Sequence, residues 1–199
     1  MANSRIVWNA NTLDFPGPLD ARSSFDRKSL RSLSMSDGKI HSTNRRLTFF
    51  EGRMVMQDFD SAGFEAGLVA WWAWAVQGKQ YAFARDSGKL YDSTAAAQVS
   101  IGDTTVQVAS TTGVTVGDWM LLLSAAGLAD AHKFLVSALL TTPTRIQFTG
   151  YASKYLFPVG AVVRHEHYFP KVVSLDDDYP VVEGLATWSL DHKFREDGA

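Results

Sequence analysis

The sequence predicts a mainly β protein with one helix. Most of the chain consists of short runs of β-forming residues separated by Gly, Pro, Asn and Asp turns. Helical spacing of apolar residues stands out in one segment, residues 61–77. The sequence pattern changes near residue 99, after which strand-like runs become shorter and turns recur about every 8–12 residues. A chain of 199 residues accommodates one domain with an insertion, or two small domains.

The first 60 residues are expected to form short strands. Residues 5–15 are rich in β-formers and end at the break formed by Pro16, Gly17 and Pro18. Residues 41–59 contain two strand-like runs, and we expect a turn between them near Glu51 and Gly52.

Residues 61–77 predict the helix. Asp60 or Ser61 can cap its first N–H groups, and Gly78 stands where a left-handed residue ends a helix. The apolar residues with helical spacing form one face, namely Phe64, Leu68, Trp71, Trp72 and Ala75.

The opposite side of this helix carries no charge. Ala66, Ala70, Ala73 and Gln77 occupy the positions where a free surface helix normally carries Lys and Glu. We interpret the helix as packed on both sides, by its own core and by a neighbouring subunit or element. The alternative is a helix inside one domain that the same chain covers on both sides.

The uncharged run over residues 66–76 does not predict a membrane anchor, because it has about half of the roughly 20 residues that cross a bilayer. After the helix, Tyr81 and Phe83 predict a strand, and Ser87 and Gly88 a turn. Residues 99–170 predict several strands of a small β-barrel or sandwich, with turns at Gly117-Asp118, Pro143 and Pro158–Gly160. A long strand pattern returns after residue 180.

Charge and composition exclude several functions. The net charge of −2 gives no global attraction to nucleic acid or to an anionic membrane, although acidic residues outnumber basic ones in residues 165–199. The chain has no cysteine, which excludes thiolate zinc sites and thiol nucleophiles and fits assembly in a reducing cytoplasm.

The sequence carries no catalytic or cofactor signature. His165 and His167 place two imidazoles on one side of a strand, where a solvated strand end is favoured over the start of a metal site. Residues 176–178 are three aspartates without the spacing of a calcium loop, which predicts a surface turn. Nucleophile-elbow and phosphate-binding glycine motifs do not occur. We therefore expect neither catalytic residues, nor a metal, nor a cofactor, and do not expect an enzyme.

Three stretches resemble the distal tail protein of long-tailed bacteriophages, which is a virion protein. The first is GLVAWWAWAVQGKQYAFARD, a helix followed by a glycine turn and an aromatic strand. The second, TTVQVASTTGVTVGDWMLLL with the later FLVSALLTTPTRIQFTGYASKYLFPVGAVVRH, resembles the small β-modules of phage tail proteins. The third, YFPKVV…YPVVEGLATWSLDHKFRED, resembles strands that close the barrel of such proteins.

The resemblance implies a tail-tube-like β-barrel or sandwich domain formed by residues 1–95 and 166–199, with the flanking helix at 61–77. Residues 96–165 would be an inserted small β-module. It further implies a structural protein of the tail tip, assembled in the host cytoplasm, that forms a ring expected to be hexameric. The expected partners are other copies of the chain, the tail tube protein, the baseplate hub and other tail-tip proteins, but not a specific nucleic acid sequence.

In such a ring the helix would lie at a subunit interface. A closed head-to-tail ring uses two different patches on each subunit, and such interfaces favour aromatic residues. The residues expected there are Ala66, Ala70, Trp71, Trp72, Ala73 and Trp74. One alternative is a carbohydrate-binding module for a host surface, using exposed aromatics such as Trp119, Tyr151 or Tyr155. Another is a different tail-completion or minor tail subunit.

Overall fold

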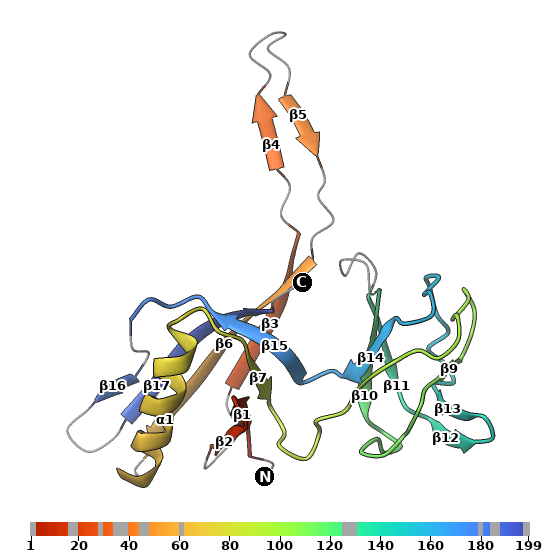
Figure 1. Ribbon diagram of the computed structural model, residues 1–199. Coiled ribbons are helices and arrows are strands. Elements are labelled where there is room, and N and C mark those ends of the chain that lie inside the picture. Colours follow the sequence, from red (N-terminus) through yellow and green to blue (C-terminus); the bar gives the residue numbers. More distant parts are fainter. Residues whose placement is uncertain are drawn as a thin grey trace.

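The structure is a computed structural model of the 199-residue chain. It describes residues 3–15, 20–27, 30–33, 40–43, 48–59, 62–124, 131–178, 181–183 and 188–196. Within these ranges the protein is mainly β with one helix, which confirms the predicted class, and the strands form antiparallel open sheets (Figure 1).

The largest sheet contains eight strands. Its hydrogen-bonded order is β2 (Asn11–Asp14), β1 (Arg5–Trp8), β7 (Tyr81–Ala84), β15 (Tyr168–Ser174), β17 (Trp188–Glu196), β6 (Thr48–Phe59) and β3 (Asp20–Arg27), and β16 (Val181–Glu183) pairs with β17. Five strands before residue 85 (β1, β2, β3, β6 and β7) thus belong to one sheet with the strands after residue 167, although about 80 residues separate β7 from β15.

The segment between β7 and β15 forms two smaller sheets, which lie to the right in Figure 1. One has the order β11 (Ala131–Leu135), β10 (Trp119–Leu123), β14 (Val162–His165) and β8 (Asp92–Thr94). The other has the order β12 (Ala138–Thr141), β13 (Thr144–Gln147) and β9 (Thr105–Gln107). We call residues 91–165 the module. Strand β8 pairs with β14, whereas the sequence prediction began the insertion only at residue 96.

The remaining two strands, β4 (Leu30–Leu33) and β5 (Ile40–Thr43), pair with each other.

Strand β6 shows that one predicted turn was wrong. The turn predicted near Glu51 and Gly52 is not formed, because both residues lie inside β6 and pair with β17 and β3. Neighbours on both sides supply hydrogen bonds that hold Gly52 extended, and this overrides its preference for a turn.

Helix α1 (Ala62–Ala75) packs against the large sheet (Figure 1). Its last turn closes with the Gly78 N–H donating to the Ala75 carbonyl at 3.0 Å, and Gly78 has φ of +70°. This left-handed conformation is nearly free of cost for glycine, so the predicted role of Gly78 is confirmed, although α1 ends at Ala75 and not at residue 77 as predicted. The predicted caps, Asp60 and Ser61, lie outside the described residues.

Two apolar clusters form the core. The first lies between α1 and the large sheet and also includes Leu121 and Leu123 from β10 of the module. The second fills the module, with Phe134, Phe148 and Phe157 fully buried. Because adjacent residues of β10 face different clusters, this strand joins the module to the large sheet through apolar contacts.

Candidate functional site

The side of α1 that faces away from the sheet is exposed and uncharged. We call this surface the outer face and define it by Ala66, Val69, Ala70, Ala73, Val76 and Gln77, which are all exposed. Val69 and Val76 retain 50% and 48% of their accessible surface. The spacing of three and four residues places all six side chains in one stripe along the helix.

The inner side of α1 is held by the chain's own core. Phe64, Leu68, Trp71 and Ala75 are buried, which confirms most of the predicted apolar face. A surface helix usually carries charged residues on its open side, whereas the outer face of α1 carries none.

Of the six residues predicted at a subunit interface, some are exposed and others are buried. Ala66, Ala70 and Ala73 lie on the outer face. Trp71 is a correction, because its side chain is completely buried within the chain and is not available to another subunit. Its ring packs edge-to-face on Tyr81, with ring centres 5.4 Å apart. Trp71 is therefore a core residue of the buried helix face.

Trp72 and Trp74 are half-buried and pack against the same core cluster. Trp74 is also fixed locally, since its Nε1–H donates to the Gln80 carbonyl at 2.9 Å and Lys79 Nζ lies 4.3 Å from its ring centre. These two tryptophans therefore support α1 from within and offer only part of their rings to a partner.

A chain of three polar side chains lies beneath α1. The ring of His192 on β17 is fully buried, and its Nε2 lies 2.6 Å from the Tyr81 hydroxyl. Its Nδ1 lies 2.8 Å from Oδ2 of Asp176, which also accepts the backbone N–H of Lys193. A carboxylate can only accept, so the neutral tautomer with a proton on Nδ1 suits this close approach, although Nδ1 and the carboxylate are not aligned as a hydrogen bond. In this tautomer the Tyr81 hydroxyl donates to Nε2.

Burial determines the protonation states of His192 and Tyr81. It lowers the pKa of His192 to about 4, although the nearby Asp176 carboxylate acts in the opposite direction. Burial also raises the pKa of Tyr81, and the charge of Asp176 adds to that effect. At neutral pH both His192 and Tyr81 are therefore uncharged. The His192 ring lies edge-to-face against Trp71, with ring centres 4.9 Å apart, so it is in direct contact with α1.

The contacts between Tyr81, His192 and Asp176 were not predicted from the sequence. The surface turn predicted at residues 176–178 holds for Asp177 and Asp178, which are exposed, but Asp176 is half-buried against His192. A signal was present in β17, where Leu190, His192 and Phe194 alternate and all three are buried.

His165 and His167 do not form the predicted pair on one strand face. Strand β14 ends at His165, and His167 lies in the following turn with the ring centres 6.1 Å apart. His165 is buried rather than solvated, because its Nε2 faces Asp118 at 4.0 Å. Burial lowers the pKa of both histidines. Within the described ranges, no three His, Asp or Glu side chains are grouped to hold a metal ion.

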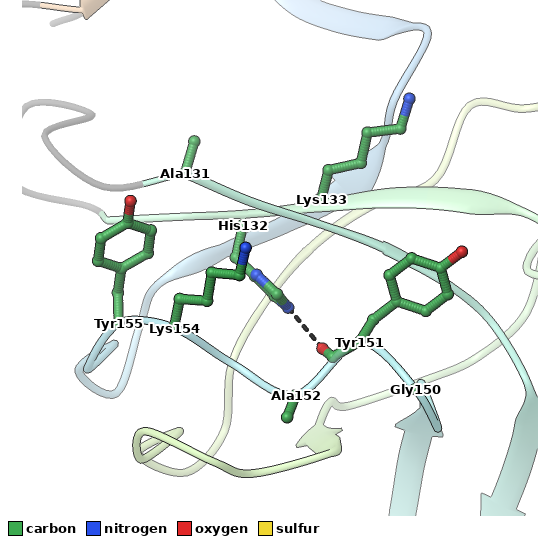
Figure 2. Close-up of a pocket in the computed structure, with 8 residues that line it drawn as sticks. All are labelled: Ala131, His132, Lys133, Gly150, Tyr151, Ala152, Lys154 and Tyr155. Carbon is green, nitrogen blue, oxygen red and sulfur yellow. Dashed lines mark hydrogen bonds between the residues drawn. The ribbon is translucent and has the colours of Figure 1, made fainter.

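The module contains a pocket of about 400 Å³ between β11 and residues 150–155 (Figure 2). It is lined by Ala131, His132, Lys133, Gly150, Tyr151, Ala152, Lys154 and Tyr155. Figure 2 shows the rings of Tyr151 and Tyr155 at opposite ends, with Lys154 between them. Both tyrosines are exposed, at 37% and 41%.

Hydrogen bonds fix the wall of this pocket. His132 Nε2–H donates to the Tyr151 carbonyl at 2.7 Å, and Ser153 Oγ–H donates to the Tyr155 carbonyl at 2.7 Å. The Ser153 N–H also donates to the Asp103 carbonyl at 2.8 Å. The segment that carries both tyrosines is thereby anchored to its surroundings at several points, as suits a preformed binding site.

The third aromatic residue named from the sequence lies beside the pocket. Trp119 packs edge-to-face on Tyr151, with ring centres 5.4 Å apart. Lys133 lies over the Trp119 ring at 4.5 Å and forms an ion pair with Glu166. The fold therefore brings together Trp119, Tyr151 and Tyr155, whereas the contribution of His132 and Lys154 could not be seen from their positions in the sequence.

Comparisons with known proteins do not assign the chain to a family. No protein-family model matches the sequence, and no curated protein matches it. In the part of the chain that the structure describes, no helix combines the length and apolar character needed to cross a membrane.

Proposed function

We propose that the protein is a structural, self-associating subunit of a phage tail tip, as its sequence resemblance implies. In this role it forms a ring, with six copies, that joins the tail tube to the baseplate hub, and the strands of the large sheet belong to the ring-forming β-barrel. Its function is mechanical and uses neither catalysis nor a cofactor.

The exposed, uncharged outer face of α1 is the observation that carries this proposal. Contiguous exposed apolar patches often mark contact sites, and small side chains let another backbone approach closely. The helix is held by a filled core on its inner side, so the outer face is presented on a rigid element. A ring contact needs such a preformed patch and a different, complementary patch on the next copy.

Ala73→Arg tests this function. The substitution places a long charged side chain in the middle of the outer face, where desolvating it in an interface is costly. Because Ala73 is exposed, we expect a folded monomer with an unchanged circular dichroism spectrum. Its thermal unfolding should remain cooperative, at a lower temperature because the stabilisation from assembly is lost.

The matched control is Val116→Arg, at an exposed apolar position of the module, 63% accessible. This variant should retain the mass of the unmodified protein in size-exclusion chromatography with light scattering. If Ala73→Arg also assembles to that mass, the outer face is not the contact surface.

The module pocket supports a second candidate function, the binding of carbohydrate on a host surface. Two exposed tyrosines face a preformed cavity, and aromatic rings offer flat apolar surfaces that suit sugar rings. Saturable quenching of tryptophan fluorescence by sugars, lost in Trp119→Phe, would favour this function because Trp119 contacts Tyr151. Unchanged fluorescence in direct titrations would count against it.

A further inference from the structure

The charged residues that line the module pocket indicate which ligand charge it favours. Among the eight lining residues are two lysines, Lys133 and Lys154, and no carboxylate. Glu166, outside the lining, forms an ion pair with Lys133, so Lys154 supplies the positive charge that favours an anionic group.

The two lysines differ in their availability. Lys133 is committed to Glu166 and to the Trp119 ring, which offsets its charge and fixes its position. Lys154 lies on the hydrogen-bonded segment between the two tyrosines and has no ion-pair partner among the described residues. Its ammonium group is therefore the one that a bound anion would meet directly.

The aromatic walls define the rest of the ligand. Tyr151 and Tyr155 stand at opposite ends of a cavity of about 400 Å³, which is within the usual range for small-molecule sites. Rings at both ends can pack against the apolar faces of a ligand, while their hydroxyl groups can exchange hydrogen bonds with its polar edges. Flat rings with many hydroxyl groups, as in sugars, meet this requirement.

We infer that the module pocket binds a saccharide that carries an anionic group, with Lys154 as the charge anchor and Tyr151 and Tyr155 as the stacking walls. This inference rests on the carbohydrate-binding function proposed above. Carboxylate and phosphate groups share the required chemistry, since the lysine ammonium acts as a point charge toward either.

Matched pairs of charged and neutral sugars test the inference. Tetragalacturonic acid is compared with its methyl ester, and glucose 6-phosphate with glucose, by isothermal titration calorimetry on the full chain. The acidic member of at least one pair should bind about tenfold more tightly at low salt, as expected for a charge-assisted contact. The preference should shrink in 0.5 M NaCl because salt screens the exposed charge of Lys154. Which pair shows the preference distinguishes carboxylate from phosphate.

Three variants assign the effect to the pocket. Lys154→Gln should abolish the preference for the acidic sugar and leave weak binding of the neutral one, whereas Tyr155→Ala should weaken both. Lys171→Gln, an exposed lysine on β15 in the large sheet, is the matched control and should bind like the unmodified protein.

The outcomes separate the two claims. Equal affinity for charged and neutral sugars, lowered by Tyr155→Ala, would overturn the anionic preference and keep the carbohydrate function. A preference that persists in Lys154→Gln would place the anion elsewhere and overturn the assignment. Absence of binding to all four sugars would overturn both claims.

Discussion

Protonation of His192 should weaken the attachment of α1 to the large sheet. Burial lowers the pKa of His192 to about 4, compared with 6.5 for a free histidine, because the ring is packed against Trp71 and Tyr81 and this outweighs the opposing effect of the Asp176 carboxylate. The two values lie about 2.5 pH units apart, and each unit corresponds to about 1.4 kcal/mol, so the neutral ring is favoured in the folded protein by about 3.5 kcal/mol.

The direction of the pH effect follows from linkage. Between pH 6.5 and pH 4 the unfolded chain binds a proton at this position and the folded chain does not. The stability contributed by neutral His192 is therefore fully present above pH 6.5 and is lost as the pH falls toward 4. At pH 4.5 roughly 2 kcal/mol of the free energy of unfolding should be lost through this residue.

Urea unfolding at pH 7.0 and pH 4.5, at one protein concentration, measures this loss. His192→Gln lacks the titrating group and should lose roughly 2 kcal/mol less than the unmodified protein between the two pH values. His167→Gln, at a half-exposed histidine in the turn after β14, is the control and should retain most of the loss. If His192→Gln and the unmodified protein lose the same free energy of unfolding, His192 is not held neutral by burial and the reasoning is refuted.

Four further substitutions test the packing around α1 and in the module by urea unfolding at pH 7. Both packing variants are compared in the monomeric Ala73→Arg background, so that assembly does not contribute. Leu68→Ala removes a fully buried side chain and should cost about 2–5 kcal/mol, whereas Val69→Ala on the outer face should cost less than about 0.5 kcal/mol. Similar losses would contradict the orientation of the helix. Gly78→Ala should cost about 1 kcal/mol because φ is +70° there, and an unchanged stability would mean that the helix ends differently. Asp118→Asn removes the ion pair with Lys89, 2.8 Å long, and should cost about 1 kcal/mol. Burial raises the pKa of Asp118, but hydrogen bonds from Lys89 and Thr115 outweigh this effect and hold the pKa below 3.8. The cost of Asp118→Asn should therefore shrink only as the pH falls below 3.8. A cost that persists at pH 2 would show that the charge of Asp118 is not its source.

Local patterns in the sequence were sufficient to predict the helix and several turns. Helical spacing identified Phe64, Leu68 and Ala75 as a buried face because the period of a helix alone decides which residues share a side. Gly117 and Gly160 were placed in turns, and both have the positive φ that makes glycine favourable there.

Contacts across the large sheet could not be predicted in the same way. His192 meets Asp176 because β17 pairs with β15, and it meets Tyr81 because β15 also pairs with β7. No local pattern reveals such pairings, since they depend on which distant strands become neighbours. Alternation along β17 predicts only that His192 faces inward with Leu190.

The pocket was predictable only in part. Tyr151 and Tyr155 could be named as candidate ligand-binding aromatics because they fall in a turn-rich segment of a predicted β-module. The lysines and His132 acquire their place through the approach of β11 to residues 150–155, which is a tertiary contact. Similarly, the far side of α1 was recognised as uncharged, but the burial of Trp71 follows from packing against Tyr81 and His192.

The solution mass of the unmodified protein tests the central claim, self-association through the outer face of α1. Light scattering at several concentrations should detect a stable species of about six times 21.9 kDa, the mass of one chain. That mass should fall to one chain in Ala73→Arg and remain unchanged in Val116→Arg. A species of 21.9 kDa at every concentration of the unmodified protein would contradict self-association.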